Sequence, residues 1–173
     1  MIFTPLRTLT LITCLLALSG CSQEEMVPVG VTGYNHIEDQ SIDYFTVNGA
    51  GGSLLPPWSG GGNTSCCVSI PEKWKPGMTA TVHWSYGKRQ GQPPPPEPQS
   101  ATVEIPEYAP KKIGNLHVHF YPDHQIKVVV TTYGLGHSYY PLPKADWAPW
   151  ELDEAVVRNL KWLEEQRAKG NIK

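Results

Sequence analysis

The stretch Thr79-Ala80-Thr81-Val82-His83-Trp84-Ser85-Tyr86 alternates between polar and apolar side chains. Successive side chains of a β-strand point to opposite faces of a sheet, so a period of two predicts a strand with one buried face. Trp84 is expected on the buried face. The segment just before it, Trp74-Lys75-Pro76-Gly77, has proline and then glycine at its centre, which fits a type II turn.

The composition extends this β pattern to most of the chain. The 173 residues include 16 Gly and 17 Pro, together with eight Tyr and six Trp. Such a composition is typical of short strands joined by rigid loops. Pro122-Asp123-His124 is a tight turn between two such segments and predicts a hairpin. The further strands that we expect are Val31–Ile37, Asp43–Asn48, Ser65–Ile70, Ala101–Ile105, Leu116–Tyr121 and Gln125–Tyr133.

The end of the chain has a different pattern. Glu151 to Lys169 contains no Gly or Pro, and Leu152, Val156, Leu160 and Leu163 recur at helical spacing. The predicted fold class is therefore α+β: a mainly antiparallel β-sheet domain with one C-terminal helix that covers one sheet.

The start of the chain has the pattern of a secretory signal. Arg7 is the only charge before Cys21, and the short apolar run Thr8–Leu18 follows it. The run is too short to span a bilayer, which takes about 20 residues. Leu18-Ser19-Gly20-Cys21 resembles the lipobox of bacterial lipoproteins. An ordinary signal peptide that happens to contain a cysteine is the alternative.

The lipobox resemblance implies a location. The chain would be cut before Cys21, which would carry fatty acyl chains such as palmitate and attach the protein to a membrane. Ser22 in place of Asp implies the outer membrane, facing the periplasm. We therefore expect a signal peptide at 1–20, a tether at 21–30 and a single globular domain at 31–173.

The charge of the chain argues against a nucleic acid partner. The sequence has 14 Lys and Arg against 16 Asp and Glu, a formal net charge of −2, and no basic cluster stands out. Nucleic acid binding needs a positive surface. Membrane contact is expected through the lipid anchor.

Two adjacent cysteines remain in the mature chain once Cys14 leaves with the signal and Cys21 is lipidated. Cys66 and Cys67 have no other partner. In an oxidising compartment they are able to form a vicinal disulfide. The alternative is that both stay reduced, one of them buried as a small apolar side chain.

His117-Val118-His119 would place two imidazoles on one face of a strand. Such a pair binds zinc or iron when further ligands join it, and it is distantly similar to the His-x-His strand of cupins. The glutamate of that motif is missing. We expect Leu116, Val118 and Phe120 to face inward and the histidines to face solvent. No metal is predicted, and the candidate ligands for one are His117 and His119, with Asp123, His124 and His137 nearby in the sequence.

No catalytic motif accompanies His117 and His119. A Gly-x-Ser-x-Gly nucleophile elbow is absent, and Trp58-Ser59-Gly60-Gly61-Gly62 imitates only its composition, without a helix to follow. No phosphate-binding glycine loop precedes a helix. We therefore predict a protein that is not an enzyme and has no cofactor.

Several motifs together resemble a family of small bacterial lipoproteins that is classed as a domain of unknown function. Some members of that family are immunity proteins of type VI secretion lipase effectors. The motifs lie within Gly33–Trp84, and they are Val47-Asn48-Gly49, the segment Gly60–Pro71 with its Cys-Cys pair, Lys73-Trp74-Lys75-Pro76-Gly77 and Val82-His83-Trp84.

The resemblance implies a periplasm-facing lipoprotein that binds and neutralises a secreted antibacterial effector, with a type VI phospholipase as the expected target. A binding face of this kind needs exposed aromatic anchors. The candidates are Trp58, Tyr86, Tyr139, Tyr140 and Trp147, whereas Trp74 and Trp84 are expected in the core. The alternatives are a structural or envelope-binding lipoprotein without a toxin partner, and a metal-dependent protein that uses His117 and His119.

The lipobox generates the first testable prediction. Cys21→Ala should abolish lipidation and firm membrane attachment, because stable anchoring depends on the buried acyl chains. Labelled palmitate incorporation measures this, with Cys14→Ala as the control that keeps normal labelling. Equal labelling of the Cys21→Ala protein would contradict the lipoprotein interpretation.

Overall fold

A computed structural model describes residues 24–88, 91, 93–146, 162, 165–166 and 168–170. The lipidation candidate Cys21, the signal peptide, Trp147 and most of the helix predicted at Glu151–Lys169 lie outside the described residues. No helix within the described residues has the length and apolarity needed to cross a membrane.

The described chain is mainly β-sheet. Its strands are β1 (Met26–Asn35), β2 (Ile42–Val47), β3 (Ala50–Gly51), β4 (Ser59–Pro71), β5 (Thr79–Tyr86), β6 (Gln99–Glu104), β7 (Asn115–Phe120) and β8 (Ile126–Thr131), and a short 3-10 turn, η1, covers Lys144–Asp146.

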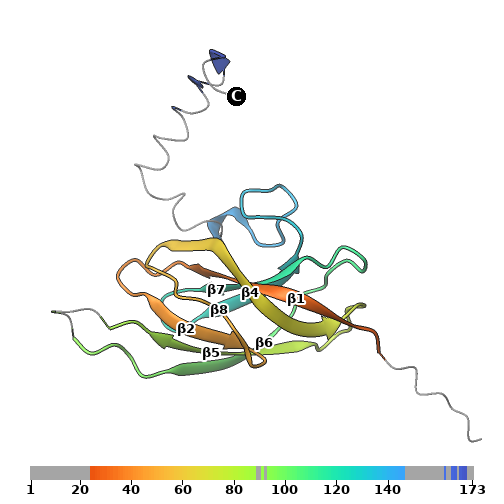
Figure 1. The fold of residues 1–173 in the computed structure, drawn as a ribbon, viewed down its shortest axis with the longest axis horizontal. Coiled ribbons are helices and arrows are strands. Elements are labelled where there is room, and N and C mark those ends of the chain that lie inside the picture. The colour runs from red at the N-terminus through yellow and green to blue at the C-terminus, as the bar shows by residue number, and fades with distance from the viewer. Residues whose placement is uncertain are drawn as a thin grey trace, which may run out of the picture.

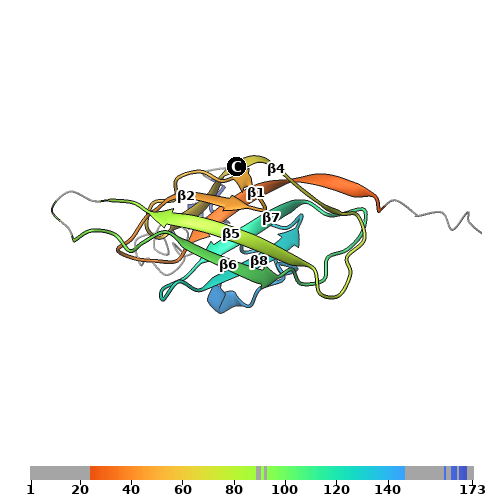
Figure 2. The ribbon, with the colours of Figure 1, turned by 90° about the horizontal axis from the view of Figure 1, so that it is seen from below.

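The strands form two four-stranded sheets that pack face to face (Figures 1 and 2). The first sheet has the order β4-β1-β7-β8, and the second has the order β3-β2-β5-β6. Every pairing is antiparallel except that of β1 with β7, which is parallel. The prediction of a mainly antiparallel β domain is confirmed, and the parallel pair is a feature that the sequence analysis missed.

The core lies between the two sheets. β5 buries its apolar face as predicted, and Trp84 packs there with its ring centroid 5.7 Å from that of Phe120. Phe45 of β2 meets Phe120 edge-on at 5.2 Å. Trp74 packs at the margin of this core and donates its indole N–H to the carbonyl oxygen of Ile105. Large aromatic side chains such as these contribute much of the apolar burial that stabilises a sandwich of this size.

Both predicted turns form. Gly77 has a φ of +81°, and the amide of Met78 bonds to the carbonyl of Lys75, as in a type II turn. In the β7–β8 hairpin, Asp123 and His124 have φ values of 58° and 59°. Two consecutive left-handed residues match the twist of the flanking strands, which explains why this short turn closes the hairpin.

Two boundaries predicted from the sequence are wrong. The tether interpretation fails from Met26 onward, because β1 begins there and pairs with the end of β4, Met26 opposite Pro71. The strand expected at Ser65–Ile70 begins earlier than predicted, because β4 starts at Ser59. The glycine-rich start of β4 becomes part of the sheet because it pairs with β1, although glycine has a poor intrinsic preference for strands.

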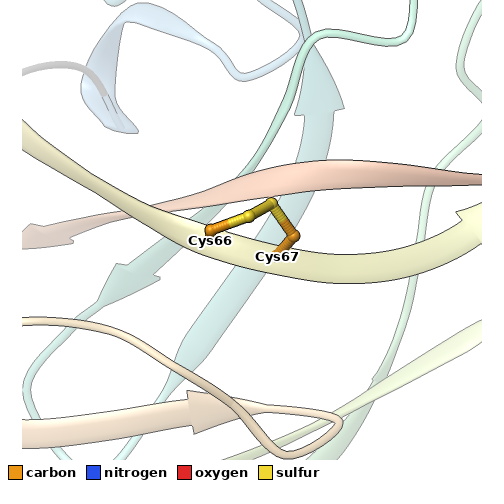
Figure 3. Close-up of a disulfide and its surroundings, with 2 residues drawn as sticks. All are labelled: Cys66 and Cys67. Atoms are coloured by element: carbon orange, nitrogen blue, oxygen red, sulfur yellow. A yellow bond between two sulfur atoms is a disulfide. The ribbon is translucent and has the colours of Figure 1, made fainter.

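An irregularity in β4 carries the cysteine pair. Val29 is opposite Val68 and Val31 is opposite Ser65, so β4 contains one more residue than β1 over this interval, as in a β-bulge. Cys66 and Cys67 occupy this bulge, are exposed, and are joined by a disulfide (Figure 3). The disulfide therefore lies on the surface of an edge strand, where the ladder is already interrupted.

Candidate functional site

The outer face of the first sheet, which points away from the second sheet, carries the candidate site. Alternation along β7 turns Leu116, Val118 and Phe120 into the core, as predicted, and turns His117 and His119 outward. The expectation that both histidines face solvent is wrong: His117 is 5% exposed and His119 is 0% exposed.

The histidines are buried because the chain after β8 returns across this face (Figure 1). Tyr140 in that segment is 5% exposed, and its hydroxyl lies 2.9 Å from Nδ1 of His117 and 2.8 Å from Nε2 of His119. Buried polar groups need hydrogen-bond partners, and one hydroxyl here supplies a partner to both rings.

The hydrogen-bonded chain continues to β1. Nδ1 of His119 lies 2.9 Å from Nε2 of His36, which directly follows β1. Aromatic rings stack along the chain: Tyr34 lies 4.7 Å from His119, and Tyr121 lies 4.4 Å from His36, between ring centroids. We call the connected groups His36, His119, Tyr140 and His117 the His–Tyr network.

Burial keeps the network uncharged. It lowers the pKa of His117 to about 4. It also lowers the pKa of His36 to about 4, an effect that nearby Asp146 partly opposes and Lys127 reinforces. The pKa of His119 is well below its usual value, first through burial and then through the charges of the other two histidines and Lys127. All three imidazoles are therefore neutral at pH 7.

In a neutral network of this kind, two proton arrangements let Tyr140 accept from one imidazole and donate to the other. Each neutral imidazole has one N–H donor and one acceptor nitrogen, and a tyrosine hydroxyl donates once and accepts as well. His117 is able to donate to Tyr140, which then donates to His119, which donates to His36. The reverse order satisfies the same contacts, so the polarity of the chain is set by what its ends contact.

The covering segment, which is the chain between β8 and η1, is also held at its far end by an ion pair. Nζ of Lys127 on β8 lies 2.8 Å from both carboxylate oxygens of Asp146 in η1. The same ammonium lies 5.2 Å from the ring centroid of Tyr121. Burial and the negative charge of Asp146 raise the pKa of Tyr121. The segment between β8 and η1 is thus attached to the sheet at Tyr140 and at Asp146.

A pocket of about 370 Å³ opens beside His117. Thr32 and Tyr34 of β1 and Asn115 of β7 line its floor, and Tyr133 and Gly134 lie on the side of the covering segment. Gly60 and Gly61 let β4 pass close to this floor: a Cβ on Gly61 would lie 2.9 Å from Cε1 of Tyr34, and φ there is +72°. The glycine run that interrupts the strand pattern therefore makes room for the Tyr34 ring.

The comparison with protein families identifies the domain. The model of a protein of unknown function, DUF3304, matches residues 34–128. The chain belongs to the DUF3304 family. No curated protein and no solved structure matches the chain. The family of unknown function expected from the motifs is confirmed, and the link to immunity proteins stays a prediction.

The DUF3304 match contains most of the network but not all of it. His36, His117 and His119 fall within the matched residues, whereas Tyr140 lies after them. The histidine pair was visible in the sequence, but its tyrosine partner was not, because nothing in the local sequence signals a contact between residues 117 and 140.

The predicted aromatic anchors separate into different environments. Tyr86 is buried, and its hydroxyl bonds to Nδ1 of His124; Tyr140 is buried in the network. The expectation that these two are exposed is therefore wrong. Trp58 is partly buried, Tyr139 is 71% exposed, and Trp147 lies outside the described residues.

The metal candidates are engaged in hydrogen bonds. His117 and His119 both direct a ring nitrogen at Tyr140. Within the part of the chain that the structure describes, no three His, Cys, Asp or Glu side chains gather as a metal-binding group.

The bridging hydroxyl gives a stability prediction. Tyr140→Phe keeps the ring but leaves two buried ring nitrogens without this partner, so the free energy of unfolding should fall by about 1–3 kcal/mol. Tyr139→Phe is the matched control and should change it by less than about 0.5 kcal/mol, because that hydroxyl is exposed. Denaturant unfolding measures both, and equal effects would contradict the bridging role.

The neutral histidines give a pH prediction. Unfolded histidine takes up its proton near pH 6.5, and folded His117 only near pH 4. Between these values the unfolded chain binds more protons, so the free energy of unfolding should fall as pH is lowered from about 6.5 to about 5. The slope is at most about 1.4 kcal/mol per pH unit for each histidine, and less for the more exposed His36. A constant value over this range would be the contradictory result.

Proposed function

We propose that this DUF3304 chain is a periplasm-facing, lipid-anchored immunity protein that binds and neutralises a secreted antibacterial effector, with a type VI phospholipase as the target. The lipobox at Cys21 and the family motifs support the class of protein. A phospholipase delivered to the periplasm attacks membrane lipid, so an inhibitor tethered at that membrane meets it at high local concentration.

The observation that carries the proposal is an exposed group of aromatic rings on the segment after β8. Tyr133 stacks on His137 at 4.4 Å between centroids, and Tyr139 lies 5.5 Å from Tyr133 and 5.6 Å from His137. His137 and Tyr139 are exposed. We call these three residues the aromatic patch. Exposed, mutually supported aromatic side chains are the residue type that most often dominates binding energy at protein interfaces.

The patch is held in place before any partner arrives. Tyr140, the residue after Tyr139, is fixed by two histidines, and Asp146 is fixed by Lys127. The amide of Tyr140 also bonds to the carbonyl oxygen of His137, which closes a turn between the two exposed rings. Less conformational freedom is then lost on binding, which favours affinity.

A second function, an envelope-binding lipoprotein without a toxin partner, is favoured by a different observation. The polar pocket next to His117 has a volume suited to a small ligand and lies on the same outer face. The two functions differ in whether they need Tyr139, which lies on the segment after β8 and does not line this pocket.

Binding of an effector tests the first function. The full-length lipoprotein should bind one phospholipase effector of the same genome with an affinity near nanomolar, about 12 kcal/mol. Tyr139→Ala should weaken this at least about tenfold, whereas Tyr44→Ala should change it by less than about threefold. Tyr44 is a matched control because it is also exposed, 52%, but belongs to the second sheet.

Cell competition provides the second readout. Deletion should sensitise the cell to the effector in its periplasm, and the lipidated wild type should restore protection better than an unlipidated form. If no phospholipase effector of the same genome binds and deletion leaves competition unchanged, the immunity function fails and the envelope-binding function takes its place.

A further inference from the structure

The pocket beside His117 has a lining without formal charge. Its described lining residues are Thr, Tyr, Asn, His and Gly, with no Asp, Glu, Lys or Arg. Its histidine is neutral at pH 7 because burial lowers its pKa to about 4. An anion or a cation would lose its hydration here without gaining an opposite charge, which is unfavourable. The lining therefore selects for uncharged ligands.

The polar atoms of the lining are hydroxyl, amide and imidazole groups. Thr32 and Thr64 share a hydrogen bond between their hydroxyls, 2.9 Å apart, and the Thr131 hydroxyl accepts from the amide of Tyr133 at 3.0 Å. Each of these hydroxyls keeps further hydrogen-bonding capacity, because a hydroxyl donates once and accepts twice. A ligand with several hydroxyls is able to form hydrogen bonds with several of these lining groups at once.

His117 connects the pocket to the His–Tyr network. Its Nδ1 is held by Tyr140, and among the described residues its Nε2 has no hydrogen-bond partner. The network is consistent with either proton order, so Nε2 is able to accept from a ligand or to donate to it. A ligand hydroxyl, which also does both, fits either state.

An aromatic side chain completes the lining. Tyr133, which is partly exposed, is the aromatic residue that a ligand is able to reach, because Tyr34 is 5% exposed and its ring stacks on that of His119. Aromatic faces pack against the C–H surface of a sugar ring while hydroxyls bond around its edge, since such rings combine an apolar face with polar margins. The pocket volume of about 370 Å³ lies within the range of about 300–1,000 Å³ that is typical of small-ligand sites.

We propose that this pocket binds an uncharged, polyhydroxylated ligand, a saccharide unit, with His117, Asn115 and the threonine hydroxyls as its hydrogen-bonding groups. The inference goes beyond effector binding and does not rest on it. The aromatic patch and the pocket share Tyr133, but Tyr139, whose exposed ring tests effector binding, does not line the pocket. In the periplasm two sources supply this chemistry: the N-acetylated glycan of the cell wall and soluble neutral oligosaccharides.

The glycines allow a sharp test. Gly134 lines the pocket, and a Cβ built there meets no atom within 4 Å, so Gly134→Trp adds bulk at the pocket without a clash at its own Cβ. Gly62 also has open space at its Cβ and does not line the pocket, which makes Gly62→Trp the matched control. Neither glycine has a φ in the left-handed region, so both positions accept a side chain.

The experiment is a ligand-observed NMR titration of the full-length lipoprotein in a detergent without sugar groups. N-acetylchitotriose represents the glycan source, maltotriose represents soluble neutral oligosaccharides, and a trimer of galacturonate is the charged comparison. At least one neutral trimer should bind at millimolar concentration, and which one binds identifies the source. The galacturonate trimer should bind at least about tenfold more weakly.

The variants decide whether the pocket is the site. Gly134→Trp should weaken binding at least about tenfold, and Gly62→Trp should leave it within about twofold. Asn115→Ala, which removes an amide at the pocket floor, should weaken it as well. Absence of binding by both neutral trimers, binding of galacturonate as tightly as the neutral trimers, or equal weakening by both tryptophan variants would overturn the proposal.

Discussion

The hydroxyl of Tyr140 is the contact on which the outer half of this structure depends. The first sheet of the sandwich is covered on both faces, and its outer face presents two imidazoles on β7 where a buried strand would ordinarily present apolar side chains. Burying these groups without partners would be unfavourable. One hydroxyl that contacts both rings removes this penalty, and it fixes the path of the chain after β8.

The same contact links the core to the surface features. Because Tyr140 is fixed, its neighbour Tyr139 is presented to solvent together with Tyr133 and His137. His117, which Tyr140 holds at Nδ1, is also one of the residues that line the polar pocket. A buried hydrogen-bond chain therefore supports both an exposed aromatic patch and a pocket of neutral polar groups. This shared support explains how one buried network holds both features, which adjoin at Tyr133.

The features that were predicted correctly from the sequence are those that depend only on neighbouring residues. The alternation of Thr79–Tyr86, the Pro76-Gly77 turn and the β7–β8 hairpin all form, because side-chain alternation and turn dihedral angles are properties of a few consecutive residues. The start of β1 at Met26 and the inclusion of the glycine segment in β4 were missed. Both result from pairing between distant strands, which overrides the weak strand preference of glycine and the tether-like appearance of residues 21–30.

The sequence by itself determined that this protein is a β-rich domain of a family of unknown function, with a lipobox-like start and a histidine pair on one strand. Only the tertiary structure decided that the pair is buried, that Tyr140 joins it and that Tyr86 is inside. The physical reason is that burial of a strand face depends on what packs across it. For His117 and His119 that cover is the segment carrying Tyr140, which the fold brings back over the sheet and which no periodicity within β7 encodes.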